Sequence, residues 1–386
     1  MTSVALRWAV SALLLASSAL AQDRQGVVVN CNKGQSLNKI LSKLNKQVAT
    51  TVVVQGTCTE YVTIDGFESL TVNGQAGAAI QQPDTPPLAN PSFVLSITGS
   101  RGVTISGLAV HSLPSVFSGI GIGKGSNQVL LQSVSVDGSW GVVVYEESQV
   151  WLLNVNVNIT SGFAAVSAFD KSDVHIVGGL LQRPSNGAFN AGLFVGSGHV
   201  TMEGITIRDM QQSITINASG SVDVSNFDSS APVSDVVIDN PSGTNFNGAI
   251  VSDSSSLNVS SARLLINNAG QSWGSNTAGI FVTNGSTLDA SSNLVVTNSQ
   301  GQGLIVTNNS HASLAGSSIS GGLHGGLVAA NLSTIDSAFG PLTFVSGNGT
   351  DLFCDSSSFL TGIASVTGFS TVNCGNLLPG NTVPLP

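Results

Sequence analysis

The feature that most constrains this chain is a short sequence unit that recurs along most of its length. The unit is clearest between Gly279 and Gly316, where two copies begin at Ile280 and Leu304, 24 residues apart. Each copy holds a short apolar alternation, a polar turn, a second alternating run, a Ser/Asn/Gly break and a third apolar run. A period of this size, built from strands too short to be stable alone, is typical of a solenoid.

Nine copies align on the second strand of the unit. The first and third positions are mostly aliphatic, as expected for side chains that face an interior. The fifth position is always Gly, Asn or Ser, which suit a tight bend, and Gly and Asn can adopt positive φ there. The pattern therefore predicts a strand followed by a corner in Val103–Gly107, Val129–Ser133, Val150–Asn154, Val174–Gly178, Val200–Gly204, Val222–Asn226, Leu257–Ser261, Leu288–Ser292 and Ala312–Gly316.

On this agreement of strand and corner, the chain resembles the right-handed parallel β-helix, or pectin-lyase-like, superfamily from about Val52 to Gly349. The resemblance implies an all-β fold, a single-stranded right-handed parallel β-helix. It says little about activity, because proteins of this fold include polysaccharide lyases, glycoside hydrolases, uronate epimerases, adhesins and phage tailspikes. A function has to be argued from a site.

Residues 1–21 have the features of a secretory signal peptide. Arg7 precedes the apolar run Trp8–Leu15, and Ala19-Leu20-Ala21 forms a small-x-small cleavage site. The apolar run is too short to span a bilayer, so we expect no stable membrane insertion after the signal is removed. The sequence predicts a secreted protein, extracellular or periplasmic.

The remaining chain divides into a cap, a solenoid and an end piece. Residues 22–50 are expected to form the cap, with a strand at Gly26–Cys31 and an amphipathic helix at Leu37–Gln47 whose apolar residues recur at helical spacing. Such a helix would cover the apolar end and the unpaired strand edges of the first coil. The β-helix is expected at residues 51–350, and an end piece with a tail lacking fixed structure at 351–386.

Four cysteines in an exported chain indicate disulfides, and none of their spacings suits a zinc site. Three pairings are possible. Proximity in the sequence favours Cys31 with Cys58 and Cys354 with Cys374, one bridge at each end of the solenoid.

The copies differ mainly in the connection between the third strand of one coil and the first strand of the next. Because every coil starts in register, these connections are expected to stack on one side and border a groove beside the first-strand sheet. Arg183 and His111 lie in them as candidate ligand contacts. Aromatic rings there either stack on sugar rings or cover their own loops, the candidates being Trp140, Phe163, Phe189, Phe246 and Trp273.

Catalytic groups are sparse on that side. The Asn-Thr-Asp, Asp-Asp, His-Gly and Arg-Ile-Lys signatures of polygalacturonases are absent. Asp209 and Asp239 are the loop carboxylates expected on adjacent coils and form the candidate acid/base pair, with Arg208 beside them as a further catalytic candidate. Such residues often bond to loop backbone instead. The hypothesis of a polysaccharide lyase is weakened because no titratable base is present at the predicted outward positions of the first strands. These positions are Gly121, Val143, Ser167, Phe194, Thr215, Ile250, Phe281, Ile305 and Val328.

The sequence thus favours an exported protein that binds polysaccharide or another surface macromolecule along a loop-lined groove. The alternatives are a carbohydrate-active enzyme (polysaccharide lyase, glycoside hydrolase or epimerase) and a structural or adhesive spacer. No cofactor or metal is expected, since a solvated acidic edge explains Glu146-Glu147 and Asp170/Asp173 better than calcium. No basic stripe for nucleic acid is present.

Overall fold

The computed structural model describes residues 26–84, 92–113, 118–183, 190–227, 234–240, 247–270, 277–291, 293–337, 343–362, 366–368 and 372–374. The predicted signal peptide at 1–21 and the final part of the predicted tail, 375–386, lie outside these residues, as do Phe189, Phe246 and Trp273. Within the described part, no helix has both the length and the apolar character needed to cross a membrane.

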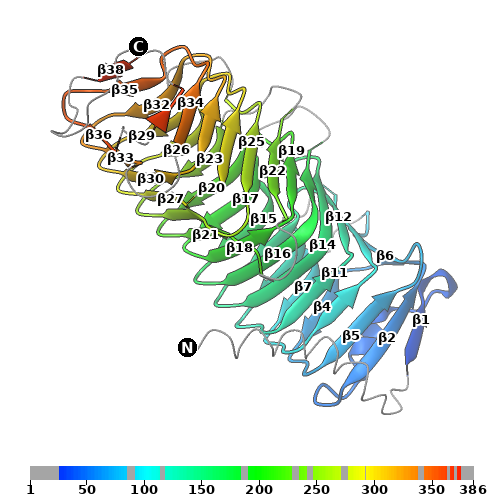
Figure 1. The fold of residues 1–386 in the computed structure, drawn as a ribbon. Helices are drawn as coiled ribbons and strands as arrows, with labels where there is room; N and C mark the ends of the chain where they lie inside the picture. The colour runs from blue at the N-terminus through cyan, green and yellow to red at the C-terminus, as the bar shows by residue number, and fades with distance from the viewer. Residues whose placement is uncertain are drawn as a thin grey trace.

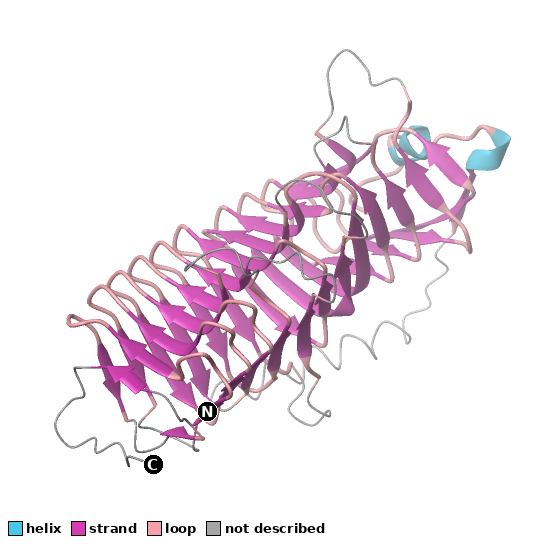
Figure 2. Cartoon of the chain, turned by 90° about the horizontal axis from the view of Figure 1, so that it is seen from above, coloured by secondary structure: helices cyan, strands magenta, loops and turns pink. Residues whose placement is uncertain are grey.

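The chain winds into a parallel β-solenoid, visible as a stack of similar coils along one axis in Figures 1 and 2. Each coil contributes three strands. The first strands form a 13-stranded sheet, and the second and third strands together form a 25-stranded sheet. These two series merge because β14 (Gln149–Ile159) and β16 (Asp173–Gln182) each run through both positions without a break. The predicted parallel β-helix is confirmed.

The strands are short, as the repeat predicts. The first strands are β4 (Val62–Asp65), β7 (Phe93–Thr98), β10 (Ser118–Gly123), β13 (Val142–Val144), β15 (Ala164–Phe169), β17 (Ala191–Gly196), β20 (Gln212–Asn217), β23 (Asn247–Val251), β26 (Ala278–Val282), β29 (Gln302–Val306), β32 (Gly325–Ala329), β35 (Leu352–Cys354) and β38 (Val372–Cys374). The second strands, besides the beginnings of β14 and β16, are β2 (Thr50–Gln55), β5 (Leu70–Gly74), β8 (Thr104–Ser106), β11 (Val129–Gln132), β18 (His199–Glu203), β21 (Ser221–Val224), β24 (Ser256–Val259), β27 (Thr287–Ser291), β30 (His311–Ala315), β33 (Thr334–Asp336) and β36 (Phe359–Thr361), with β1 (Val27–Asn30) paired to β2. The third strands, besides the ends of β14 and β16, are β3 (Thr57–Thr59), β6 (Ala79–Gln81), β9 (Ala109–His111), β12 (Ser135–Gly138), β19 (Thr206–Arg208), β22 (Val236–Asp239), β25 (Leu264–Asn267), β28 (Leu294–Thr297), β31 (Ser318–Ser320), β34 (Thr343–Ser346) and β37 (Val366–Thr367).

The alignment of the repeat is confirmed residue by residue in the second strands. The first position pairs from coil to coil in the order Val129, Val150, Val174, Val200, Val222, Leu257, Leu288 and Ala312, and all of these are buried in the core. Positive φ at the fifth position makes the predicted corner at Gly107, Ser133, Asn154, Gly178, Gly204 and Gly316. One aliphatic column therefore fills the rod along its axis.

Glycine shapes a second corner, where the chain passes from the third strand to the first. A Cβ placed there would lie 2.2 to 2.9 Å from a β-branched side chain of the third strand in the same coil. Any larger residue would push the third strand away from the first, so the corner closes only around a small one. The glycines are Gly119, Gly141, Gly192, Gly248, Gly279, Gly303 and Gly326.

Serine forms a ladder inside the remaining corner, between the first and second strands. The backbone N–H of each serine donates to the hydroxyl oxygen of the serine in the next coil, at 3.2 Å each time. These bonds satisfy backbone donors that would otherwise be buried without a partner. The ladder runs through Ser255, Ser286, Ser310, Ser333 and Ser358.

The cap helix is shorter than the sequence predicted. Helix α2 spans Leu37–Leu41, after the short 3₁₀ turn η1 (Cys31–Lys33), and both lie at one end of the rod in Figure 2. Beyond Leu41 the backbone tightens into i−3 hydrogen bonds, and the Asn45 side chain accepts the N–H of Gln47. This local turn competes with the helix that apolar spacing alone would continue to Gln47.

The helix nevertheless covers the end of the solenoid. Leu37 and Leu41 belong to the buried core, as the apolar stripe predicted. The Asn38 side chain accepts the backbone N–H of Thr63 at 3.0 Å and donates to the carbonyl of Tyr61, so it pairs with the outer edge of β4. The first edge of the sheet is thereby blocked against further strand pairing.

Both predicted disulfides are confirmed. Cys31–Cys58 ties η1 to β3, and Cys354–Cys374 ties the last two first strands, β35 and β38. One bridge therefore secures each end of the rod.

Candidate functional site

The outward column of the first-strand sheet has the composition and register that the sequence predicted. Neighbouring strands pair so that Gly121, Val143, Ser167, Phe194, Thr215, Ile250, Phe281, Ile305 and Val328 form one line. No member of this line is titratable, and Phe194, Ile250, Phe281 and Val328 keep part of their surface in solvent. This face of the rod is apolar although it points outward.

Four aromatic rings, here called the aromatic row, lie in contact on this face. Trp140 and Phe163, both predicted from the loops, have ring centroids 5.3 Å apart. Phe163 meets Phe194 edge-on at 4.6 Å, and Phe194 lies 5.4 Å from Phe169. All four rings are partly exposed. They come from the first strands of three consecutive coils and the corners that lead into them, so local packing fixes their positions before any ligand arrives.

A second aromatic pair lies on the same sheet beside the row. The rings of Phe93 and Tyr145 stack with centroids 5.8 Å apart. They lie over Gly121 and Gly123, where an added Cβ would be 2.4 Å from the nearest ring atom. Burial, and to a smaller extent the charge of Glu146, raises the pKa of the Tyr145 hydroxyl. The two glycines thus make room for a pair of flat rings on the sheet surface.

The third-strand ends carry the polar candidates. His111 Nδ1 lies 3.2 Å from Asp137 Oδ2 on the next coil. Arg208 Nη2 lies 3.8 Å from Asp239 Oδ2, and the Asn267 amide lies 3.5 Å from Asp239 Oδ1. These contacts are links between neighbouring coils at the edge of the corner.

The candidate catalytic residues lie together on two adjacent coils, as predicted. Arg208 pairs in register with Asp239, and the backbone N–H of Asp209 donates to the Asp239 carbonyl at 3.2 Å. Asp209 has positive φ, +54°, which suits an Asp in a corner. An acid/base role for Asp209 and Asp239 stays a prediction.

The sequence reasoning missed a cluster on the outward face of the second strands. Trp151 and His175 stack with centroids 4.2 Å apart, and Phe227 lies 5.4 Å from each ring. His175 Nε2 lies 3.1 Å from Asp173 Oδ2. Burial is the largest single influence and acts to raise the pKa of Asp173, but the hydrogen bonds from His175 and Gln149 and the charges of His175 and His199 together lower it. A signal existed, because Trp151 and His175 both occupy the second position of the aligned segments.

Next to this cluster, a histidine lies between a hydroxyl and a carboxylate. His199 Nδ1 is 2.8 Å from Ser221 Oγ, and Nε2 is 3.8 Å from Asp223 Oδ2. The order resembles a nucleophile, base and acid. However, His311 Nδ1 bonds to Thr334 Oγ1 at 2.7 Å in the same column and register. The recurrence shows that His-to-hydroxyl bonds are a way of linking coils, so we assign no catalysis to Ser221.

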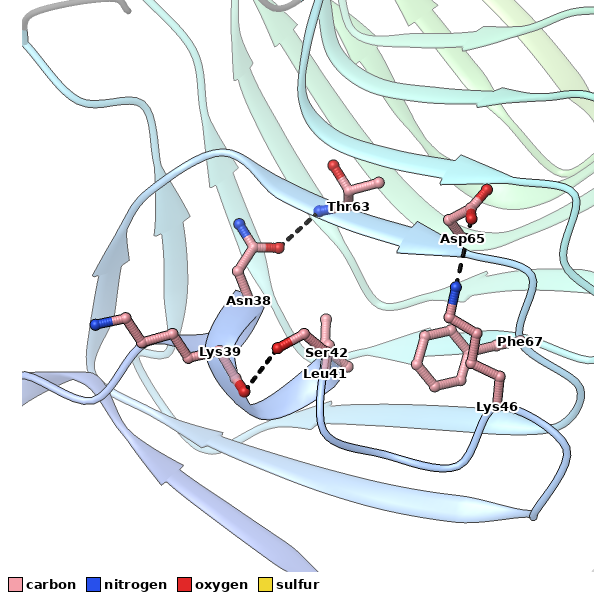
Figure 3. A pocket seen from close by; sticks show the side chains of 8 residues that line it. All are labelled: Asn38, Lys39, Leu41, Ser42, Lys46, Thr63, Asp65 and Phe67. Carbon is pink, nitrogen blue, oxygen red and sulfur yellow. Dashed lines mark hydrogen bonds and ion pairs between the residues drawn. The ribbon is translucent and has the colours of Figure 1, made fainter.

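An open pocket lies between the cap and the first coil (Figure 3). Its volume is about 490 Å³, and it is lined by Asn38, Lys39, Leu41, Ser42, Lys46, Thr63, Asp65 and Phe67. The Lys46 ammonium lies 3.4 Å from Asp65 and 5.9 Å from the centre of the Phe67 ring. Lys46 and Asp65 are thus paired with each other, and none of the predicted ligand contacts lines the pocket.

Within the described residues, one group of three potential metal ligands lies close together, Cys31, Cys58 and Glu60. The two cysteines form a disulfide. Glu60 accepts hydrogen bonds from the Ser36 hydroxyl and the Leu37 N–H, so it caps helix α2. The group has a structural explanation and no free thiolate for a metal.

Comparisons with known proteins add similarity of fold only. No family model and no curated protein matches the chain. Among solved structures, PfbA, a surface adhesin of Streptococcus pneumoniae, is 11% identical over 86% of this chain and 92% of that one, with a TM-score of 0.45. The Dettilon tailspike protein is 13% identical over 84% and 62%, with a TM-score of 0.43. A lacto-N-biosidase from Eubacterium ramulus is 10% identical over 97% and 72%, with a TM-score of 0.25. Since these three TM-scores are below 0.5, function has to be argued from this chain's own residues.

Proposed function

We propose that this protein is an exported binding protein that holds polysaccharide on the aromatic row. The observation that carries the proposal is the set of four partly exposed rings in mutual contact on an outward sheet face. Flat rings offer sugar faces a large apolar area, and rings already held by their neighbours lose little entropy on binding. Trp140, at one end of the row, and Phe163, which touches both Trp140 and Phe194, are the main contacts of this proposal.

A comparison of the outward columns of the first and second strands supports a binding role for the rings rather than a role in covering the sheet alone. The equivalent outward column of the second strands is polar over its C-terminal part, at Thr201, Asp223, Asn258, Asp289, Ser313 and Asp336. Over the same coils the outward column of the first strands is apolar except at Thr215, and consists otherwise of Phe194, Ile250, Phe281, Ile305 and Val328. Both columns belong to the same solenoid, so the fold does not itself require an apolar surface. Of this column, Phe194, Ile250, Phe281 and Val328 keep part of their surface in solvent, and exposed apolar side chains gathered on one face are characteristic of an interaction surface.

Export is supported by covalent structure. Both disulfides join segments at the ends of the rod, where coils have a neighbour on one side only. Such bridges form and persist in oxidising compartments, in line with the predicted signal peptide. The polysaccharide is thus met outside the cytoplasm.

A retention assay on a panel of immobilised polysaccharides tests the proposal. Trp140→Ala and Phe163→Ala are each expected to weaken retention by about tenfold or more, the effect of truncating a central aromatic contact. Trp151→Ala is the matched control, because Trp151 is also a partly exposed, stacked tryptophan but lies on the second-strand sheet. If Trp140→Ala and Trp151→Ala lose retention equally, or neither does, the aromatic row is not the binding face.

A further inference from the structure

The pocket between the cap and the first coil lies on the same sheet face as the aromatic row. Its residues Thr63 and Asp65 occupy outward positions of β4, and both side chains are exposed. They pair in register with Ser96 and Thr98 of β7, and the next strand, β10, has glycine at both positions. The pocket thus stands at the beginning of the two outward columns that carry rings further along the rod.

The stacked pair of Phe93 and Tyr145 joins the pocket to the aromatic row. Both rings are partly exposed and lie over the two glycines of β10. Tyr145 directly follows Val144, and Phe169 directly follows Ala168, the partner of Val144 on the next coil, so Tyr145 and Phe169 hold equivalent places. In the strand order β4, β7, β10, β13, β15 and β17, five steps of about 4.8 Å lead from the pocket to the far end of the row, about 24 Å in all. A track of pocket and rings therefore runs along the rod.

Inside the pocket, an accessible ion pair offers hydrogen-bonding groups to a ligand (Figure 3). Lys46 Nζ lies 3.4 Å from Asp65 Oδ2, and the two side chains are 45% and 55% exposed. The Thr98 hydroxyl donates to Asp65 Oδ1 at 2.8 Å. Each carboxylate oxygen keeps a further lone pair, and the ammonium keeps further protons, so both groups can bind a ligand without breaking these contacts.

The charges of the pocket favour a neutral ligand. The hydrogen bond from Thr98 is the largest influence on Asp65 and, with the hydrogen bond and charge of Lys46, outweighs burial and lowers the pKa of the carboxyl. The ionised carboxylate beside the ammonium suits two neighbouring hydroxyl groups, one donating to Asp65 and one accepting from Lys46. An anionic group would be repelled by Asp65 and by a protein of formal net charge −9. Arg183, the basic ligand contact predicted from the sequence, is buried, with 5% of its surface exposed.

The dimensions of the pocket and the cap decide which part of a glycan fits. The volume of about 490 Å³ is within the range of small-molecule sites, about 300–1,000 Å³. Beyond the pocket, the Asn38 side chain of helix α2 accepts the N–H of Thr63, so the cap occupies the edge of β4. A chain that follows the sheet face from the aromatic row therefore ends at the cap, with its last sugar in the pocket.

We propose that the pocket binds the terminal sugar of a neutral glycan that lies along the rod axis. Neighbouring hydroxyls of this sugar bond to Lys46 and Asp65, and the sugars that follow lie on the pair of Phe93 and Tyr145 and then on the aromatic row. The inference rests on the function proposed above and adds the class of glycan, its direction on the rod and the site of its end.

Titration of the mature protein with oligosaccharides of graded length tests the site. The probes are ladders from xylan, mannan and β-glucan, which are neutral, and from polygalacturonate, which is anionic. Affinity for the neutral ladder that binds is expected to rise until the chain spans about 24 Å and then to level off. Lys46→Gln and Asp65→Asn are each expected to lower the affinity for long chains by about tenfold or more. Lys43→Gln is the matched control, because Lys43 is an exposed cap lysine that does not line the pocket.

Three results overturn the inference: unchanged affinity in both pocket variants, tighter binding of polygalacturonate than of every neutral ladder, or an affinity that does not depend on chain length. A wild type that binds none of the neutral ladders overturns it as well. Thr63→Tyr covers a failure of a pocket variant to fold. Tyrosine suits an exposed strand position and its ring fills the pocket, so the same tenfold loss is expected.

Trp140→Ala separates this inference from the proposed function. If Trp140→Ala binds as the wild type does while Lys46→Gln and Asp65→Asn lose affinity, the aromatic row is not the binding face and the pocket stands as a sugar site. If Trp140→Ala loses affinity and the two pocket variants do not, the pocket inference fails and binding on the aromatic row stands. Loss in all three variants supports a glycan that extends from the pocket to the row.

Discussion

The glycine corner makes a quantitative prediction about how the coil closes. A Cβ added at Gly119 would lie 2.5 Å from Val136 Cγ1 and 3.3 Å from the carbonyl oxygen of Gly141. The close contact is therefore with one methyl group of a buried valine, and the contact with the backbone is merely tight. Gly119 also donates its N–H to the Trp140 carbonyl at 2.8 Å, so this corner supports the aromatic row.

The magnitudes follow from that geometry. Gly119→Ala adds one methyl group to a filled core, which lowers the free energy of unfolding by about 1–3 kcal/mol. The stiffer unfolded chain offsets about 0.4–1 kcal/mol of this loss. Val136→Ala removes two buried methyl groups at about 0.8 kcal/mol each and leaves a small cavity, about 2–3 kcal/mol in total. In the double variant, the new methyl occupies space that the valine has left. We expect the double variant to lose about 1–2 kcal/mol less than the sum of the single changes.

Urea unfolding followed by circular dichroism measures the three free energies of unfolding, provided that the variants share one m-value. Val136→Ala combined with Gly125→Ala is the control, because nothing lies within 4 Å of a Cβ at Gly125 and its positive φ adds strain without a contact to the core. That pair should be additive. Additivity within about 0.5 kcal/mol for Gly119 and Val136 as well would refute the explanation of the glycine corner.

Three further predictions concern the C-terminal end and the catalytic alternative. The backbone N–H of Asn331 is the largest of the influences that hold the pKa of Asp355 at about 2, so the ionised Asp355 carboxylate should stabilise the fold fully above pH 4 and lose this effect as the pH falls towards 2. Asp355→Asn should therefore make the free energy of unfolding less dependent on pH in that window, by on the order of 1 kcal/mol after solvent screening. An unchanged pH profile would contradict this. Replacing Cys354 and Cys374 by serine should lower the local opening free energy of the last coils by up to about 3 kcal/mol. Hydrogen exchange should become faster there and stay unchanged in the central coils. A polysaccharide panel should give no new reducing ends or unsaturated products, and products that disappear in Asp209→Asn would instead establish an enzyme.

The sequence predicted the repeat well because inward positions obey one rule in every coil. A side chain that faces the core has to be apolar and of moderate size whichever coil it belongs to, so Val129, Val150 and Val174 could be aligned without any structure. The same alignment fixed the outward column, since side chains alternate along a strand. The disulfides followed because each pair lies in neighbouring coils at one end.

The remaining details depend on contacts that a repeat does not encode. The cap helix ended early because Asn45 forms a turn that apolar spacing cannot reveal. The sequence predicts Phe194 in the outward column and Phe163 in a loop, but it does not predict the edge-on contact between the two rings. Phe227 reaches Trp151 across three coils, a separation that no periodicity predicts.

Phe194 offers the sharpest distinction between a binding face and a protective cover. The next coil carries Thr215 at the paired position, so the sheet accommodates threonine there. Phe194→Thr removes ring contacts to Phe163 and Phe169, each worth about 0.5–1.5 kcal/mol, while the core beneath stays filled. If the ring exists to bind glycan, retention should fall about tenfold or more and stability by no more than about 3 kcal/mol. A larger loss of stability with retention unchanged would mean that the aromatic row serves the fold, because an outward ring that binds nothing has only its neighbours to stabilise.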